Sequence, residues 1–340
     1  MFLRNAWYAA EISARVAQQP LAVRVLDEPV VLYRKLNGEP VALEDACPHR
    51  KMPLSMGRLR GDDLECSYHG MTFDGSGACI RVPGTQTIPD TARVRSYPVA
   101  DRYGLLWIWM GNPLAADPAT IINVEHWGEA TIGCTAPDSM VMECNYLFIT
   151  DNLLDPTHVA WVHPSSFGDA NCAQTPLNTV ATPQGMVVSR WMLATAVAPF
   201  YSQFVKFKGD ADRKQHYEVR FPSYALTRAI FTPAGTGGDD QALHPDAFSM
   251  DSYGFITPID AASSRYFFFQ IRNFAPDDAA VSSAFASAVR AAFEEDRAVL
   301  EAVQKGMTHK RTPNLDLKID AGPTRFRRRL KQMIDAEPGA

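Results

Sequence analysis

The 340-residue sequence lacks a long hydrophobic run, because no stretch approaches the roughly 18 consecutive apolar residues of a membrane-spanning helix. Met1–Pro20 carries charges among its apolar residues and therefore lacks the continuous apolar core of a signal peptide. An excess of positive charge is also absent, since 33 lysines and arginines stand against 38 aspartates and glutamates, for a net charge of −5. We therefore expect neither a membrane protein, nor a secreted precursor, nor a general nucleic-acid binder.

Cysteine is scarce, with six residues in the chain. Four of the six show no spacing that is typical of metal ligands and are expected to be buried free thiols: Cys79, Cys134, Cys144 and Cys172. Because free thiols persist in reducing compartments, we expect a cytoplasmic protein. The chain is long for one hydrophobic core, so two domains are favoured over one.

The other two cysteines each have a histidine close by. Cys47-Pro48-His49 and Cys66-Ser67-Tyr68-His69 form two short Cys/His pairs, separated by residues 50–65. A Rieske [2Fe–2S] cluster requires this ligand set, because two histidines replace two cysteines on one of its irons and raise the reduction potential. The alternative is a structural zinc site with two cysteines and two histidines, although zinc fingers favour longer histidine spacing.

Residues 1–112 are predicted to form a small all-β domain that carries these pairs. Short runs with β-branched residues predict strands at Val23–Leu26, Val30–Arg34, Pro40–Glu44 and Leu105–Trp109. Asn37-Gly38 predicts a type I′ turn between two of these strands. Pro48 and Gly70 indicate that the Cys/His pairs lie in turns, at the tip of the domain.

Residues 113–340 are predicted to form a second, catalytic domain after a connector at Pro113–Pro118. Alternating side chains predict strands at Gly185–Trp191, His216–Phe221, Tyr224–Phe231 and Tyr266–Ile271. Helical patterns cover Tyr146–Val162 and Asp278–Lys305, and the Gly- and Asp-rich Thr232–Pro245 predicts a loop. The expected fold class is α+β, with an N-terminal all-β domain followed by a domain in which helices flank an antiparallel sheet.

A second group of candidate ligands follows the pattern N-x-x-D-x-x-H-x-x-x-x-H, formed by Asn152, Asp155, His158 and His163. His163 would lie off the face of His158 in a regular helix, but Pro164 indicates that the helix ends there. An irregular helix end could bring both imidazoles to one point. Two histidines and one carboxylate form the facial triad of non-haem Fe(II) oxygenases, which leaves positions open for O₂ and substrate.

The third ligand is expected from the helix Asp278–Lys305. Asp296 follows Phe293 by three residues and so falls within the apolar stripe of this helix. An unpaired carboxylate on a buried face is costly, and a metal ion would remove that cost. A buried ion pair with Arg290 or Arg297 is the alternative.

Together, these motifs resemble those of the Rieske non-haem iron oxygenases. The resemblance rests on Arg4-Asn5-Ala6-Trp7-Tyr8, Cys47-Pro48-His49-Arg50, Cys66-x-Tyr68-His69-Gly70, Asp151-Asn152-Leu153-Leu154-Asp155-x-x-His158, Trp161-Val162-His163, Arg272-Asn273-Phe274 and Glu294-Glu295-Asp296-Arg297. It covers essentially the whole chain and is greatest for the short oxygenases of the vanillate O-demethylase, dicamba O-demethylase and toluenesulfonate methyl-monooxygenase group.

The resemblance implies a role for each candidate residue. The cluster ligands would be Cys47, His49, Cys66 and His69, and the ligands of a mononuclear Fe(II) would be His158, His163 and Asp296. Asp155 would bind no metal, but would bridge His69 of one subunit to His158 of the next in a head-to-tail homotrimer. Asn152 would lie near the iron without binding it strongly. Pro156 departs from the family pattern and predicts a different local helix geometry, because proline has no N–H to donate.

The resemblance also implies an activity. The chain would be the terminal oxygenase of a monooxygenase system, fed with electrons from NAD(P)H by a reductase that contains flavin and an iron–sulfur centre. With O₂ as co-substrate, it would hydroxylate the methyl or methoxy group of an aromatic acid. Ring dihydroxylation is the alternative within this class, and a Rieske electron carrier or a zinc-stabilised binding protein are the alternatives outside it.

Two further expectations concern substrate and partner. Tyr217–Phe231 and Met250–Ile256 are expected to line the substrate pocket, where Arg228 or Tyr253 could orient a carboxylate or sulfonate unless each is an ordinary surface or core residue. The basic run Arg325–Lys331 is either a solvated helix face or a docking patch for an acidic reductase.

Overall fold

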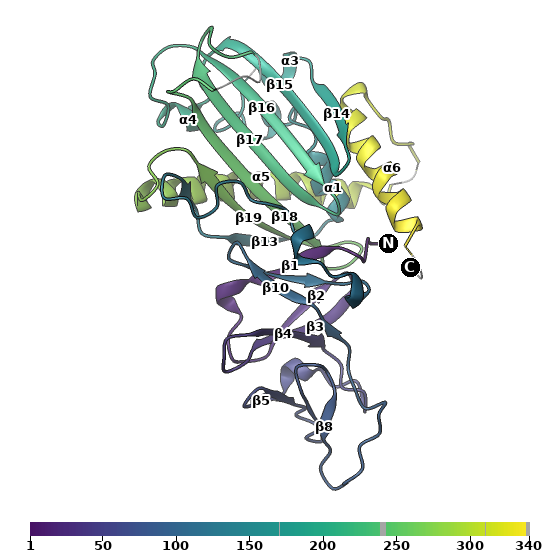
Figure 1. Ribbon diagram of the computed structural model, residues 1–340. Coiled ribbons are helices and arrows are strands. Elements are labelled where there is room, and N and C mark those ends of the chain that lie inside the picture. Colours follow the sequence, from purple (N-terminus) through teal and green to yellow (C-terminus); the bar gives the residue numbers. More distant parts are fainter. Residues whose placement is uncertain (170, 239–242, 310, 338–340) are drawn as a thin grey trace. The chain divides into compact units, whose positions relative to one another are not determined.

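The computed structural model describes residues 1–169, 171–238, 243–309 and 311–337, and Figure 1 shows the elements along the chain. The chain divides into two compact units. The first contains Met1–Ile122, Thr257–Ala261 and Glu337, and the second contains Asn123–Ile256 and Ala262–Ala336. The first unit therefore ends at Ile122, beyond the expected boundary at 112, and takes in a segment from late in the chain. Of the helices described, none combines the length and hydrophobicity needed to cross a bilayer.

The described part of the first unit forms one three-stranded and two four-stranded sheets, all antiparallel. The three-stranded sheet has the order β1-β11-β10, with β1 at Trp7–Ile12, β10 at Val99–Arg102 and β11 at Leu105–Trp109. One four-stranded sheet has the order β2-β3-β4-β9, at Leu21–Val25, Glu28–Arg34, Pro40–Glu44 and Ser96–Tyr97. The other has the order β5-β6-β7-β8, at Arg58–Arg60, Asp63–Glu65, Thr72–Phe73 and Cys79–Arg81. Short 3₁₀ helices occupy Ser13–Arg15, Leu54–Met56, Pro113–Ala115 and Pro118–Thr120.

The hairpin between β3 and β4 is present, but the prediction of a type I′ turn is wrong. A type I′ turn requires positive φ at both central residues. Here Gly38 has a φ of 87°, whereas Asn37 does not have a positive φ. The turn instead begins at Lys35, whose carbonyl accepts from the Gly38 N–H (2.9 Å) and whose own N–H donates to Glu39 O (2.9 Å).

The second unit is built on one eight-stranded sheet, counted over the described residues. Its order is β12-β19-β18-β17-β16-β15-β14, with β13 also pairing with β19. The strands are β12 at Gly133–Cys134, β13 at Asp138–Met142, β14 at Asn178–Thr182, β15 at Gly185–Thr195, β16 at Ala211–Arg220, β17 at Tyr224–Pro233, β18 at Phe248–Pro258 and β19 at Ser264–Arg272. The α+β fold class is confirmed. In the expected loop Thr232–Pro245, the first two residues belong to β17 and residues 239–242 lie outside the described part.

Helices cover this sheet, and Figure 1 shows α5 running along β13 and β19. The helices are α1 at Tyr146–Asn152, α2 at Val159–Val162, α3 at Asn171–Gln174, α4 at Pro199–Ser202, α5 at Ala279–Gly306 and α6 at Ala321–Asp335, with a 3₁₀ turn at Lys318–Asp320. Asp278 caps α5 by accepting from the N–H groups of Ala280 (2.9 Å) and Val281 (3.0 Å). The buried stripe of α5 consists of Phe285, Val289, Ala292, Asp296 and Leu300. Its spacing of three and four residues faces the helix toward the sheet.

The single helix expected over Tyr146–Val162 is wrong, because the structure breaks it into α1 and α2. Pro156 lies in the break. Proline has no N–H for an intrahelical bond, and it disfavours helical backbone at the residue before it. The chain therefore leaves α1 after Asn152 and resumes helical structure only at Val159.

Candidate metal centres

Two loops of the first unit carry the Cys/His pairs, and their backbones are closed in the same way. Cys47 N–H donates to the carbonyl of the fifth residue after it (2.9 Å), and its own carbonyl accepts from Lys51 N–H (2.8 Å). Cys66 repeats this pattern, donating to the fifth residue after it (2.8 Å) and accepting from Gly70 N–H (3.0 Å). Lys51 and Gly70 have positive φ values of 57° and 71°, which turn each loop back on itself.

The histidine side chains of these loops are exposed, whereas the cysteine side chains are buried. The Nδ1 atoms of His49 and His69 lie 3.1 Å apart, on exposed rings. Cys47 and Cys66 are each 2% exposed and belong to the apolar core of the loops. Sulfur donors on the buried side and nitrogen donors on the exposed side fit a two-iron cluster in which one iron takes thiolates and the other takes imidazoles.

The zinc alternative fits this geometry less well. A zinc ion would require the four side chains to surround one point. Within the described residues, the one set of at least three His, Cys, Asp or Glu side chains that can surround a single ion lies elsewhere, in the second unit. Burial also raises the pKa of the Cys47 thiol, so a thiolate there depends on the positive charge of bound metal.

The set in the second unit consists of His158, His163 and Asp296, whose ligand atoms all lie within 4.8 Å of one another. His158 immediately precedes α2, and His163 immediately follows it with φ −121° and ψ 42°, outside helical values. The irregular helix end predicted from Pro164 is therefore present. Asp296, on the buried stripe of α5, is 4% exposed.

Each imidazole is anchored at Nδ1 and leaves Nε2 free. His158 Nδ1 contacts the backbone carbonyl of Asp155, and His163 Nδ1 lies 2.6 Å from Glu295 Oε2. These acceptors assign the proton to Nδ1 on both rings. Both Nε2 atoms consequently face Asp296 Oδ1, at 3.5 Å from His158 and 3.3 Å from His163. Metal-binding histidines in proteins are held in this way.

The described neighbours of Asp296 are two imidazoles and an amide. Asn152 Nδ2 donates to its Oδ1 (3.0 Å). The alternative ion pair with an arginine is wrong, because Arg290 pairs with Asp138 (2.5 Å) and Glu294 (3.7 Å), and Arg297 pairs with Glu294.

The same carboxylate affects the neighbouring imidazole. Burial lowers the pKa of His163, but the Asp296 and Glu295 carboxylates outweigh it, so that the pKa is raised above its ordinary value. The three candidate ligands thus share negative charge that a cation would balance.

Asp155 is a turn residue at the edge of a groove. Its Oδ1 accepts from Thr157 N–H (2.9 Å), which caps the turn that leads to His158. The groove has a volume of about 400 Å³ and is lined by Asp155, His158 and Asn152 on one side and by α5 and residues 314–327 on the other. An acidic side chain beside a candidate iron ligand is therefore accessible from outside this unit.

A separate cavity contains all three candidate iron ligands in its wall. It is lined by His158, His163 and Asp296 together with aromatic, apolar and hydroxyl side chains, among them Phe167, Tyr201, Tyr217, Thr227, Ser252 and Phe293. Tyr217, Thr227 and Ser252 are direct cross-strand partners on β16, β17 and β18. Their hydroxyl groups thus form a polar row within a largely apolar cavity.

Arg228 and Tyr253, the residues expected to orient an acid group, do not line this cavity. Each follows a cavity residue by one position, so the alternation of a strand directs it to the opposite face. Arg228 pairs there with Asp251 (2.6 Å) and Glu125 (2.8 Å). The Tyr253 hydroxyl accepts from Glu125 N–H (3.2 Å).

The sequence placed Tyr217 within a range expected to line the pocket, and Tyr217 lines the cavity, but it gave no role to Glu295 or Tyr201. Periodicity placed Glu295 beside the apolar stripe, and that placement hid its contact with His163. A second acid directly before Asp296 was the only signal for it. Tyr201, on the four-residue helix α4, gave no signal in the sequence.

A close approach of backbones shapes the loop after His163, since a Cβ on Gly168 would lie 2.2 Å from Val159 O.

Comparison with known proteins matches a separate family model to each part of the chain. A model of the Rieske [2Fe-2S] domain matches residues 6–98, and a model of the vanillate O-demethylase oxygenase C-terminal domain matches residues 142–336. The toluene-4-sulfonate monooxygenase system iron-sulfur subunit TsaM1 of Comamonas testosteroni is 37% identical over 100% of this chain and 99% of its own length. The vanillate O-demethylase oxygenase subunit of a Pseudomonas species is 33% identical, over 100% and 97%. The crystal structure of dicamba monooxygenase bound to 3,6-dichlorosalicylic acid superposes with a TM-score of 0.91, at 28% identity over 99% of both chains.

Proposed function

The chain belongs to the Rieske non-haem iron oxygenases of the vanillate O-demethylase type, and from that premise we propose that its substrate is an aromatic acid with a methyl or methoxy group. The protein is the oxygenase component of a monooxygenase system, in which a partner reductase supplies electrons and O₂ is the co-substrate. When bound, the Rieske cluster supplies electron transfer and the mononuclear Fe(II) supplies O₂ activation.

One observation carries the proposal. The Nε2 atoms of two histidines face a single carboxylate oxygen at the wall of a cavity that is lined by aromatic rings. An aromatic substrate would pack between Phe167 and Phe293, with its methyl or methoxy carbon toward His158, His163 and Asp296. One oxygen atom of O₂ enters a C–H bond of that carbon, and the other leaves as water with two electrons and two protons.

We assign the individual residues as follows. The cluster is held by Cys47, His49, Cys66 and His69, and the Fe(II) is held by His158, His163 and Asp296. Two observations support this assignment. The two loops place buried sulfur donors beside exposed nitrogen donors, and the Nε2 atoms of His158 and His163 both face Asp296 Oδ1. Asn152 holds Asp296 through its amide (3.0 Å), and Glu295 keeps the Nδ1 proton on His163.

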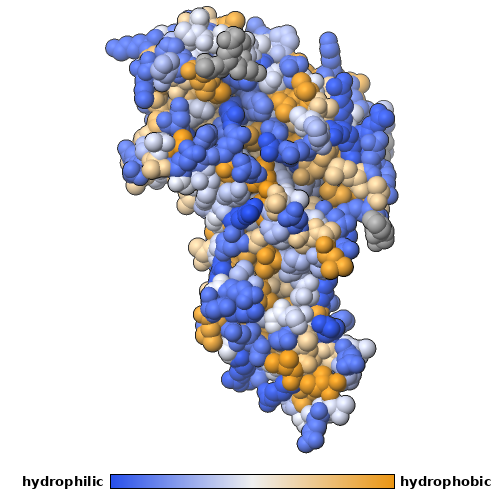
Figure 2. All heavy atoms as spheres, in the orientation of Figure 1, coloured by the Kyte–Doolittle hydropathy of each residue, from blue (hydrophilic) through white to orange (hydrophobic). Residues whose placement is uncertain are grey.

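The assembly that we propose is a head-to-tail homotrimer in which Asp155 lies between His158 of one subunit and His69 of the next. Exposed apolar side chains support a contact near both histidines. Around the cluster loops, Met56 is 65% and Tyr68 59% exposed, and Figure 2 shows apolar side chains grouped at the end of the first unit that carries β5 and β8. In the second unit, Trp161 is 76% exposed between the two candidate iron ligands.

We further propose a reductase that contains flavin and an iron–sulfur centre, uses NAD(P)H and works with this protein in the cytoplasm. The basic run lies on α6, where it serves the fold as well. Arg327 pairs with Asp151, and Arg329 donates to the carbonyls of Thr182 (2.7 Å) and Gly185 (2.8 Å). Arg325 and Arg328 are exposed and are therefore the candidates for docking an acidic partner.

The test is a substrate screen with the purified protein and a surrogate reductase. Methoxybenzoates, methylbenzoates and methylbenzenesulfonates are supplied, and oxygen uptake, formaldehyde and alcohol products are measured. We expect formaldehyde from a methoxy substrate or a benzylic alcohol from a methyl substrate. Formation of a cis-diol would instead establish ring dihydroxylation. Absence of substrate-dependent oxygen uptake, with iron present only in the cluster, would establish an electron carrier.

A further inference from the structure

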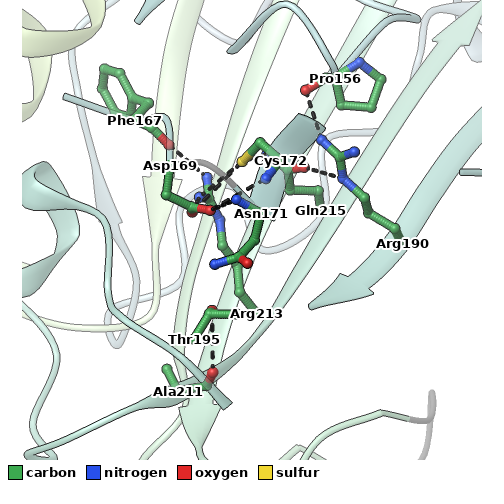
Figure 3. Close-up of polar contacts among 10 residues, drawn as sticks. All are labelled: Pro156, Phe167, Asp169, Asn171, Cys172, Arg190, Thr195, Ala211, Arg213 and Gln215. Carbon is green, nitrogen blue, oxygen red and sulfur yellow. Dashed lines mark hydrogen bonds and ion pairs between the residues drawn. The ribbon is translucent and has the colours of Figure 1, made fainter. Parts of the chain in front are cut away.

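Two arginines lie buried behind the cavity, on the strands β15 and β16. Arg190 is 5% and Arg213 1% exposed. Figure 3 shows both side chains directed from the sheet toward the segment that runs from Pro156 to Cys172. Cationic side chains are almost never fully buried unless they are paired, so this pair requires an explanation.

The two arginines differ in their partners. Arg213 pairs with Asp169 (2.8 Å) and donates to Phe167 O (2.9 Å), while its Nε has no partner in the described structure. Among the described residues, Arg190 donates to the neutral oxygens of Gln215 (2.7 Å), Thr175 (3.1 Å) and Pro156 (2.9 Å), and the Asp155 carboxylate acts on it from a distance. Arg190 therefore has no direct ion pair in the described part of the chain, and its positive charge is opposed only at a distance.

This charge lies directly behind two tyrosines of the cavity. The Arg213 guanidinium carbon is 5.5 Å from the centre of the Tyr201 ring. Burial raises the pKa of Tyr217, and the charges of Arg213 and Arg190 oppose that effect, which places both cations within electrostatic reach of its hydroxyl. Tyr201 and Tyr217 both line the cavity, whereas no lysine or arginine of the described residues does. The buried arginines therefore act on the two tyrosines without lining the cavity themselves.

Phe167 connects the candidate iron ligands with the tyrosines. Its ring centre is 6.5 Å from that of His163 and 5.5 Å from that of Tyr201. A candidate iron ligand and a cavity tyrosine therefore flank the same ring, and a one-ring acid packed against Phe167 would lie next to both.

We propose that Tyr201 and Tyr217 form an anion subsite, in which their hydroxyls donate hydrogen bonds to the carboxylate or sulfonate of the substrate and Arg190 and Arg213 stabilise its charge from behind. The subsite rests on the proposed function, since it states where the acid group of that substrate is held. Burial raises the pKa of Tyr201 to about 12 and raises that of Tyr217 as well, so both hydroxyls keep their protons at neutral pH. An anion between two such donors gains charge-assisted hydrogen bonds.

The test compares an acid with its neutral counterpart. Binding of 4-methylbenzoate, 4-methylbenzenesulfonate and 4-methylbenzamide to the anaerobic holoenzyme is measured by calorimetry for wild type, Tyr201→Phe and Tyr217→Phe. We expect each variant to bind both acids about 10- to 100-fold more weakly, with little change for the amide. Tyr253→Phe is the matched control, because it removes a hydroxyl from the same sheet on the opposite face, and it should change neither.

A second variant tests the charge behind the tyrosines. Arg190→Gln should weaken binding of the acids and spare the amide, whereas Arg228→Gln, which removes an arginine from the opposite face, should spare both. Melting curves establish that each variant is folded. Equal losses for acids and amide, or no loss in any variant, would overturn the subsite and leave Thr227 and Ser252 as the polar contacts.

The subsite and the proposed function can fail independently. If the wild type oxidises acids while the tyrosine variants do not discriminate between acid and amide, the subsite alone is wrong. If the tyrosines select acids but no acid or ether is oxidised, the proposed substrate is wrong and the subsite stands.

Discussion

Glu295 Oε2 lies 2.6 Å from His163 Nδ1, on the side of the imidazole ring opposite to Asp296. The two neighbouring acids of α5 therefore act on one histidine in different ways. Asp296 faces the nitrogen that is free to bind metal, and Glu295 holds the proton on the other nitrogen. Such outer carboxylates orient the ligand and raise its basicity.

Replacing Glu295 should therefore weaken metal binding. We expect Glu295→Ala to reduce the Fe(II) or Co(II) affinity of the mononuclear site about 10- to 100-fold, and Glu295→Gln to reduce it less, because its amide oxygen still accepts from Nδ1. Metal affinity is measured by competition with a chelating dye. Glu294→Gln is the control, since Glu294 pairs with arginines and contacts no candidate ligand. Equal effects at positions 294 and 295 would contradict the role of Glu295.

Asp155→Asn should retain both metal centres and lose most turnover. Its amide oxygen can still accept from Thr157 N–H, so the turn before His158 should persist. Iron content and the electron paramagnetic resonance signal of the reduced cluster check the loading, and oxygen uptake checks the activity. Normal turnover in this variant would refute the bridging role.

Electron transfer between subunits can be tested by complementation. His158→Ala should lack the mononuclear iron and Cys66→Ser should lack the cluster, so each protein alone should be inactive. Mixed trimers bring an intact cluster of one subunit next to an intact iron site of another, and we expect them to regain activity. If mixed trimers form and stay inactive, the relay does not cross the subunit boundary.

Glu218 should make stability depend on acidic pH. Although burial raises its pKa, hydrogen bonds and charges from His216 and Arg220 outweigh that effect and lower the pKa to about 2. A depressed pKa stabilises the folded state above the unfolded value, near 4.3, and this contribution is lost as the pH falls toward 2. The linked stabilisation is about 3 kcal/mol. The difference in melting temperature between wild type and Glu218→Gln should thus shrink from pH 7 to pH 3, and a constant difference would contradict the linkage.

The basic run on α6 should separate into structural and docking residues. Arg327→Ala should lower stability by about 1 kcal/mol, because it removes the pair with Asp151. Arg328→Ala should leave the melting temperature unchanged and slow turnover driven by the reductase, most clearly at low salt. If the rate of Arg328→Ala equals that of wild type at every salt concentration, the run has only its structural role.

Local patterns predicted some strands of the first unit well. β4 and β11 occupy the predicted residues, and β3 differs only in beginning two residues earlier, because β-branched runs bounded by turn residues leave few alternatives. The turn type at Gly38 was predicted wrongly because the turn begins at Lys35, and the Asn37-Gly38 pair alone does not determine where it begins.

The second unit was harder to predict, because its strands carry buried polar groups. β16 begins at Ala211, five residues before the predicted start, and includes Asp212 and Arg213. Asp212 accepts from the N–H groups of Ala194, Gly235 and Gly237, which are remote in sequence. A pattern of alternating apolar and polar residues cannot identify a strand whose buried polar side chains form hydrogen bonds with residues remote in sequence.

The candidate iron site was predictable where periodicity and chemistry agreed. Asp296 was found because an acid on an apolar stripe requires a reason, and that reason did not depend on distant contacts. Tyr217 lies in a range that was expected to line the pocket, whereas Tyr201 reaches the cavity from a four-residue helix that nothing in its local sequence marks.

Arg190 has a consequence beyond its charge. Its guanidinium binds Gln215 in the sheet and the carbonyl of Pro156, two residues before His158. Because the helix is broken here, this carbonyl can accept a hydrogen bond from the arginine. One cation thereby ties the sheet to the turn that ends in His158, so a negative ligand that attracts this cation would also act on the position of a candidate iron ligand.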